Sequence, residues 1–118
     1  MLRRHNFNIE TLPSLPDCPD SHFVEDTAVL FRDPAGGGEE VAVVCSNMAG
    51  PRRPEVPTMV AALEAQPDPF DRLEYLDGDG EMLDGGDVLK CPVSSRVYVG
   101  LSSRSSEAGV QKVRGFLY

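Results

Sequence analysis

The shortness of the apolar segments is the feature that most constrains what this chain can fold into. The longest of them, such as Val41–Cys45, hold about five residues, and prolines, glycines or charged residues separate them. A membrane-spanning helix needs about 20 apolar residues, so none of these segments is long enough to cross a bilayer. They suit short strands and short amphipathic helices, so the sequence predicts an α/β domain.

Length and charge narrow the class of protein further. The 118 residues fit one domain, and 41% apolar residues are enough to build its core. With 11 Lys and Arg against 19 Asp and Glu, the net charge is −8, and the pI is about 4.6. Nucleic acid and anionic membranes are therefore not expected as partners, because both require clustered positive charge.

Cysteine usage indicates a reducing compartment. Cys18, Cys45 and Cys91 are odd in number and widely spaced, which argues against a disulfide framework and against a zinc site. Arg3 and Arg4 are not followed by the apolar stretch of a signal peptide. We therefore expect a cytoplasmic protein that binds no metal and no cofactor.

The hydrophobic pattern predicts two hairpins, each followed by a helix. Strands are expected at 7–12, 22–31, 40–46, 73–76, 86–90 and 96–101, with a turn at 33–39. One helix is expected from Pro57 to about Gln66, because proline suits the first position of a helix. A second helix is expected after SSRSSE, where Val110, Val113 and Leu117 recur at helical spacing.

The order of hairpin and helix repeats after roughly 50–60 residues. A single unit of this kind rarely buries both faces of its sheet alone. The second helix would still be unfinished at Tyr118, so both ends of the chain are expected to be cut.

Glu25 and Asp26 are the most unusual pair of residues, because they interrupt the apolar segment FVEDTAVLF. In a continuous strand, alternation would put Glu25 on the face of Phe23 and Asp26 on the face of Val24. Carboxylates are rarely buried unless they are paired. Two interpretations remain open: the strand begins later and the pair lies in solvent, or the pair forms a cation site at the end of a core strand.

Other candidate residues lie in short motifs that are weak individually. In LDGGDVL, Asp84 and Asp87 flank two glycines, which is also typical of a plain turn leading into a strand. Arg52 and Arg53 in PRRP are either solvated surface charges or ligands. Arg104, just before the second helix, suits a carboxylate ligand or is simply a surface residue.

Together, the motifs FVEDTAV, RRPEV, LDGGDVL and YVGLSSR resemble, in this order and spacing, dimethylarginine dimethylaminohydrolase of the amidinotransferase superfamily. The resemblance extends from about Leu15 to the C-terminus. It implies a five-bladed α/β propeller, of which residues 1–118 would form a single partial catalytic domain with roughly two incomplete ββαβ blades. It also implies hydrolysis of methylated arginine to citrulline and a methylamine, without a cofactor.

The resemblance also implies a role for individual residues. The acidic residues that contact the substrate match Asp20, Glu25 and Asp26. Arg52 and Arg104 match the arginines that hold the substrate carboxylate, and Asp84 matches the carboxylate that orients the catalytic histidine. These roles agree with physical chemistry, because carboxylates accept the donors of a guanidinium in pairs and an arginine fork suits a carboxylate.

The residues of the covalent step have no counterpart in this chain. Neither His5 nor His22, nor any of the three cysteines, lies in the motif that carries the family's histidine or nucleophile. The chain is therefore expected to carry residues that bind methylated arginine and to show no hydrolase activity alone. The alternative is a non-catalytic relative that binds arginine analogues or only a protein partner.

A partial propeller also predicts an exposed apolar surface. The last strand and the second helix would lack the blades that cover them, and their apolar residues are Val97, Val99, Leu101, Val110, Val113 and Leu117. We therefore expect the isolated chain to be poorly soluble, to self-associate through this surface, or to depend on a complementary fragment.

Overall fold

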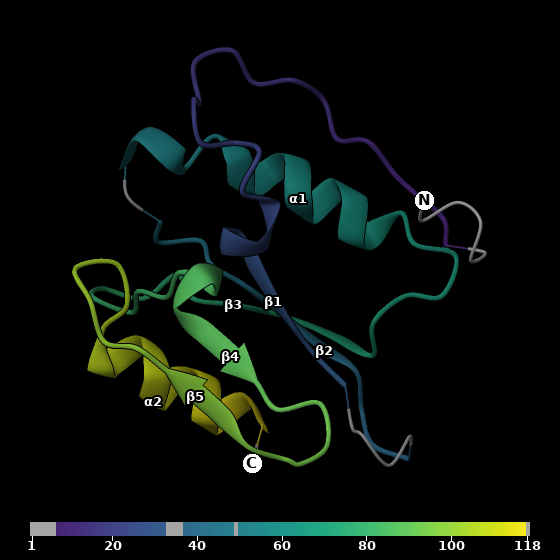
Figure 1. The fold of residues 1–118 in the computed structure, drawn as a ribbon. Coiled ribbons are helices and arrows are strands. Elements are labelled where there is room, and N and C mark those ends of the chain that lie inside the picture. The colour runs from purple at the N-terminus through teal and green to yellow at the C-terminus, as the bar shows by residue number, and fades with distance from the viewer. Residues whose placement is uncertain (1–6, 33–36, 49, 118) are drawn as a thin grey trace.

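The computed structural model describes residues 7–32, 37–48 and 50–117, which form two small sheets and two α-helices (Figure 1). The larger sheet contains β1 (Ala28–Phe31), β2 (Val41–Val44) and β3 (Arg72–Tyr75). The smaller sheet is the hairpin of β4 (Val88–Lys90) and β5 (Val97–Val99). Helix α1 (Glu55–Glu64) connects β2 to β3, and helix α2 (Glu107–Leu117) follows β5. The described ranges also contain the short 3-10 helices η2 (Val24–Asp26), η3 (Gly50–Arg52) and η4 (Gly85–Asp87).

Strand β2 is the centre of the larger sheet, and all four of its residues are buried. It pairs antiparallel with β1, with Phe31 opposite Val41, and parallel with β3, with Val44 opposite Tyr75. The parallel pair needs a crossover connection, and α1 provides it. The predicted hairpins are both confirmed, since β4 and β5 also pair antiparallel.

The larger sheet lies between the two helices (Figure 1). On one face, Ala42 and Val44 pack with Leu63 of α1. On the other face, a larger cluster joins the sheet to α2 and to the β4–β5 hairpin; its buried members include Val29, Phe31, Val41, Val43, Leu83 and Val113. The predicted α/β class is therefore confirmed, with a core on both faces of the sheet.

Two strand predictions are wrong near the N-terminus. Residues 7–12 form no strand, and the strand expected at 22–31 begins only at Ala28. Both the N–H group and the hydroxyl of Thr27 donate to the carbonyl of Val24, at 3.3 Å and 2.7 Å, which turns the chain into η2. Residues 24–26 therefore do not alternate between the faces of a sheet.

The remaining elements agree with the prediction within a few residues. Helix α1 begins two residues before Pro57, and β3, β4 and β5 are three or four residues long. Ser106 caps α2, because its Oγ accepts the N–H of Gly109 at 3.0 Å. Most of the expected turn at 33–39 lies outside the described residues, as do His5 and Tyr118. In the described part of the chain, no helix is both long and apolar enough to cross a membrane.

Candidate functional site

The segments that carry FVEDTAV and LDGGDVL meet where η2 packs on η4. Gly85 approaches so closely that a Cβ atom there would lie 1.8 Å from the carbonyl oxygen of Glu25. A Cβ on Gly86 would lie 2.6 Å from Oδ1 of Asp26 and 3.1 Å from Oδ1 of Asp84. The two glycines of the motif therefore allow this contact, and they place the two aspartates side by side.

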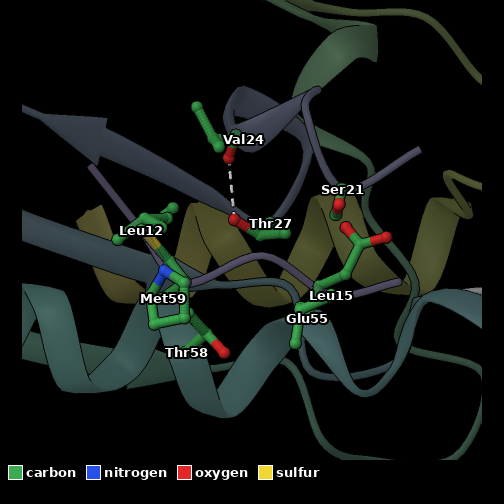
Figure 2. A pocket seen from close by; sticks show the side chains of 9 residues that line it. Leu12, Leu15, Ser21, Val24, Thr27, Glu55, Thr58 and Met59 are labelled. Atoms are coloured by element: carbon green, nitrogen blue, oxygen red, sulfur yellow. Dashed lines mark hydrogen bonds between the residues drawn. The ribbon is translucent and has the colours of Figure 1, made fainter. Parts of the chain in front are cut away.

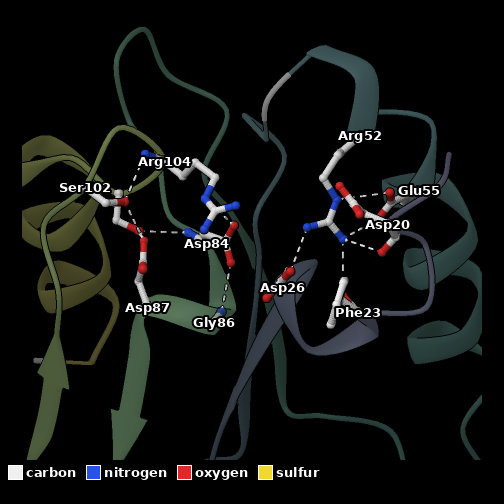
Figure 3. A network of polar contacts seen from close by, with 11 residues as sticks. Asp20, Phe23, Asp26, Arg52, Glu55, Asp84, Gly86, Asp87, Ser102 and Arg104 are labelled. Atoms are coloured by element: carbon white, nitrogen blue, oxygen red, sulfur yellow. Dashed lines mark hydrogen bonds and ion pairs between the residues drawn. The ribbon is translucent and has the colours of Figure 1, made fainter.

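Arg52, at the end of η3, lies at the centre of one half of the site (Figure 3). Its Nη1 lies 2.6 Å from Oδ2 of Asp26, and its Nη2 donates to the carbonyls of Asp20 and Phe23 at 3.0 Å and 3.3 Å. Glu55 accepts from Nε at 3.1 Å and from Nη2 at 2.8 Å. The hydrogen bond with Glu55 is the largest cause that raises the pKa of Arg52 above its usual range.

Most of the hydrogen-bond donors of Arg52 are therefore used by contacts within the protein. A guanidinium has five N–H groups. Nε uses one of them, Nη2 uses both of its own for three acceptors, and Nη1 uses one toward Asp26. Within the described ranges, one N–H, on Nη1, has no acceptor in the protein and could face a ligand.

Asp84 anchors the other half of the site from the residue before η4 (Figure 3). Its Oδ1 accepts the N–H of Gly86 at 2.9 Å, and its Oδ2 lies 3.3 Å from Nε of Arg104. Burial raises the pKa of Asp84, as do a hydrogen bond with Asp26 and the negative charge of Asp26. Protonation of Asp84 is therefore favoured, because burial and a neighbouring negative charge both disfavour its ionised form.

A small network of hydroxyl groups positions Arg104. Ser102 and Ser105 each donate to Oδ2 of Asp87 at 2.7 Å, which lowers the pKa of Asp87. Ser102 also accepts the backbone N–H of Arg104 at 3.0 Å. The side chain of Arg104 is 57% exposed, so its guanidinium lies over Asp84 and remains accessible from solvent.

The structure treats Glu25 and Asp26 differently. Asp26 is buried against Arg52 and Asp84, whereas Glu25 is exposed, and its carboxylate has no hydrogen bond within the described residues. Asp20 is also exposed, and it enters the network through its carbonyl. The strand therefore begins later, as the first interpretation expected, and Glu25 lies in solvent, whereas Asp26 is buried and ion-paired with Arg52.

Three residues near the site were given no role by sequence reasoning. Glu55 lies in RRPEV, three residues after Arg52, a spacing that allows an ion pair at the start of a helix. Asp87 was noted only as part of a turn. Cys45 gives no signal in the sequence, yet burial and the charges of Asp84 and Asp26 raise its pKa to about 12.

The arrangement suits a small molecule that carries both a cation and an anion. Arg104 offers an accessible guanidinium, and the carboxylate of Glu25 is free at the edge of the network. Asp26, Arg52 and Asp84 are buried, and the pairs Arg52–Asp26 and Arg104–Asp84 balance their charges; no buried side-chain polar atom among the described residues lacks a hydrogen bond. No cluster in the described ranges is arranged to hold a metal ion.

Two hollows lie outside this network. A recess of about 20 Å³ between the N-terminal segment and α1, lined by Leu12, Leu15 and Met59, has room for about one water molecule (Figure 2). A cleft of about 650 Å³ lies between the two sheets and α2. Its lining includes five of the six residues of the expected apolar surface, Val97, Val99, Val110, Val113 and Leu117.

Comparison with known proteins agrees with the motifs. No protein-family model matches the chain. A dimethylarginine dimethylaminohydrolase of Streptomyces coelicolor is 36% identical over 116 residues, which is 96% of this chain and 39% of that enzyme. An uncharacterised protein of Aeropyrum pernix is 34% identical over 113 residues, again 96% of this chain and 38% of the relative. The chain thus spans less than half the length of either relative, and along nearly its whole length it is similar to part of a dimethylarginine dimethylaminohydrolase, as its motifs predict.

Proposed function

We propose that this chain provides the substrate-binding side of a dimethylargininase, a hydrolase that converts methylated arginine and water to citrulline and methylamine or dimethylamine. The observation that carries the proposal is the pairing of Arg52 with Asp26 and of Arg104 with Asp84 in one network. All four of the family-like motifs contribute to this network, and they are far apart in the sequence. The similarity to the Streptomyces enzyme supports the same function.

The proposed roles follow the accessibility of each group. Glu25 and Asp20 contact the substrate guanidinium directly. Asp26, which is buried, stabilises the guanidinium through its negative charge. Arg104 holds the substrate carboxylate, and Arg52 adds its one remaining N–H. Asp84 orients a histidine that this chain does not itself supply in the matching motif.

The covalent step needs a nucleophile from elsewhere. The carbon of a guanidinium is stabilised by resonance and requires an activated attacker. Cys45 is fully buried and its pKa is raised to about 12, so it stays a thiol at neutral pH. Cys18 is also buried, and its thiol donates to the carbonyl of Pro51 at 3.6 Å. None of the three cysteines, Cys91 included, lies in the motif of the family's nucleophile, so the chain alone is expected to form no citrulline.

The proposed fold of the whole enzyme is a five-bladed propeller, to which residues 1–118 contribute a partial catalytic domain. Support comes from the repeated order of elements: β1, β2 and α1 are followed by β3, and β4, β5 and α2 occur in the same order. Helix α2 packs with Val88 and Val99 of its own hairpin and also on the preceding sheet. Such packing between successive units is how a repeat architecture extends.

The test is binding of asymmetric dimethylarginine to the 118-residue chain, measured by isothermal titration calorimetry. We expect binding of the wild type, about tenfold weaker binding after Glu25→Gln or Arg104→Gln, and no citrulline in any sample. Glu64→Gln, at the exposed far end of α1, is the matched control and should bind as the wild type does. A folded wild-type chain that binds no dimethylarginine would contradict the proposed role, and binding of arginine and dimethylarginine with equal affinity would favour a general arginine-binding protein.

A further inference from the structure

Glu55 is a buried carboxylate that the proposed substrate contacts do not use. It lies in the first turn of α1 and is only 4% exposed. Both of its oxygens accept from Arg52, at 3.1 Å from Nε and 2.8 Å from Nη2 (Figure 3). A paired fork of this kind fixes the plane of the guanidinium as well as its distance.

The orientation of Arg52 in turn determines where the acidic segment lies. Nη2 of Arg52 holds the carbonyls of Asp20 and Phe23, and Nη1 holds the carboxylate of Asp26. Residues 20–26 precede β1 and have no strand partner of their own. Their anchor to the rest of the molecule is therefore this guanidinium together with the contact between η2 and η4.

We propose that Glu55 is a positioning residue of the candidate substrate site, holding Arg52 so that Nη1 faces Asp26 and Nη2 fixes the segment from Asp20 to Phe23. The inference rests on the proposed function, because it concerns the same site. Figure 2 shows the Glu55 side chain extending from α1 toward Ser21, within this segment. Helix α1 is a rigid base for it, because Leu63 of the same helix is packed in the core.

The substitution Glu55→Gln isolates this role. The side chain keeps its size and one acceptor oxygen, but its NH₂ group faces an N–H of Arg52, so one of the two hydrogen bonds is lost. The charge that balances Arg52 then comes from Asp26 alone. The guanidinium is expected to turn toward Asp26, which loosens the hold of Nη2 on the carbonyls of Asp20 and Phe23.

The experiment measures two properties of the folded 118-residue chain. The first is the affinity for asymmetric dimethylarginine by calorimetry, which should fall about 10- to 100-fold in Glu55→Gln, the range found when a supporting contact of a site is removed. The second is NMR: the slowly exchanging Nε–H signal of Arg52 should be lost, and the carboxyl carbon signals of Asp26 and Asp84 should shift. A merely structural role would leave these carboxyl signals unchanged.

Controls separate positioning from stability and charge. Glu64→Gln removes the same charge from the other end of α1, and it should leave affinity and carboxyl signals unchanged. Glu55→Asp keeps the charge on a shorter side chain, and its affinity should lie between those of the wild type and Glu55→Gln. If Glu55→Gln does not fold, the same readings are taken on Glu55→Asp, with the same direction expected.

The two proposals can fail separately. A wild type that binds no dimethylarginine rejects the proposed function for this chain, and the carboxyl signals of Asp26 and Asp84 then decide the role of Glu55. A folded Glu55→Gln chain with unchanged carboxyl signals and unchanged affinity overturns the positioning role, even if the wild type binds dimethylarginine.

Discussion

Adjacent carboxylates in η2 have opposite environments, and this difference decides which of them can contact a ligand. Asp26 is removed from water, and Arg52 balances its charge at 2.6 Å. Glu25 remains hydrated, so a ligand meets its carboxylate without first breaking a contact within the protein. An ionised carboxylate can be buried only with such a partner, because its desolvation is otherwise too costly.

The raised pKa of Asp84 predicts a specific dependence of stability on pH. Above the ordinary pKa of an aspartate, about 4, the unfolded chain releases this proton while the folded protein still holds it. The contribution of Asp84 to stability is therefore complete below about pH 4 and is lost as the pH rises through the raised pKa. Asp84→Asn lacks this titration. The free energy of unfolding of the wild type, relative to that of the variant, should therefore fall as the pH rises from about 4 through the raised pKa of Asp84.

Urea unfolding at a series of pH values measures this difference. Asp79→Asn, in the exposed turn before η4, is the matched control, and it removes an aspartate that is not buried. If the stability of the wild type relative to Asp79→Asn fell with pH as steeply as its stability relative to Asp84→Asn, the assignment to Asp84 would be wrong.

The environments of the cysteines predict an order of reaction with alkylating reagents. Hydrogen bonds from the Ser94 side chain and from the backbone of residues 93 and 94 lower the pKa of Cys91, whereas burial raises that of Cys45 to about 12. Because the thiolate is the reactive form, Cys91 should react with iodoacetamide at pH 7.5 at least about 100-fold faster than Cys45. Peptide mass spectrometry of timed samples measures both rates, and comparable labelling of the two cysteines in the folded protein would disprove this order.

At the scale of elements, the start of α2 positions the loop that carries Arg104. Ser106 accepts the N–H of Met82 at 3.1 Å and that of Gly109 at 3.0 Å, so it joins the helix to the segment that leads into Asp84. Gly109 packs against this segment without a side chain between them. The helix therefore fixes both halves of the Arg104–Asp84 pair relative to each other.

Two glycines of α2 should respond oppositely to the same substitution. A Cβ on Gly109 would lie 2.1 Å from the carbonyl oxygen of Met82, whereas a Cβ on Gly115 would have no heavy atom within 4 Å. Gly109→Ala should lower the free energy of unfolding by about 1–3 kcal/mol through overpacking. Gly115→Ala should raise it by about 0.5–1 kcal/mol, because alanine loses less conformational entropy in a helix.

Urea denaturation at 25 °C measures the change in the free energy of unfolding for both variants, with one common dependence of that free energy on urea concentration. The pair forms its own control, since both variants add the same methyl group to the same helix. A stabilising Gly109→Ala would show that α2 can move away from Met82, and would contradict its fixed position.

For the whole molecule, the outer face of the β4–β5 hairpin is the main exposed apolar feature among the described strands. Leu89 and Tyr98 are opposite each other on this face and are 68% and 55% exposed. The inner face packs on the core through Val88 and Val99. Exposed apolar patches of this kind favour association, and a net charge of −8 weakens association but does not bury the patch.

Leu89→Glu should therefore reduce self-association and the binding of a dye that detects apolar surface. Ala61→Glu, on the exposed side of α1, adds the same charge without removing an exposed large apolar side chain. Sedimentation velocity and dye fluorescence on all three proteins compare the two effects. Equal reductions in both variants would assign the change to charge, and a strictly monomeric wild type without dye binding would contradict the expected association.

The sequence by itself determined the order of most elements and pointed to several of the residues that meet in the network. Helices α1 and α2 and both hairpins follow from local periodicity and from proline and serine at the helix starts, because these signals act over a few neighbouring residues. The motifs also pointed to Arg52, Asp84 and Arg104. Local signals failed at residues 7–12 and 22–27, where an apolar alternation exists but no neighbouring strand pairs with it.

Only the tertiary structure decided which charges are buried and what they hold. Asp26 and Arg52 are 26 residues apart in the sequence, and their contact depends on η2, η3 and the first turn of α1 meeting at one point. The tight contact at Gly85 then brings Asp84 to the same place. Burial and ion pairing are properties of segments that meet in space, so no local pattern could separate Glu25 from Asp26 or show that Glu55 holds Arg52.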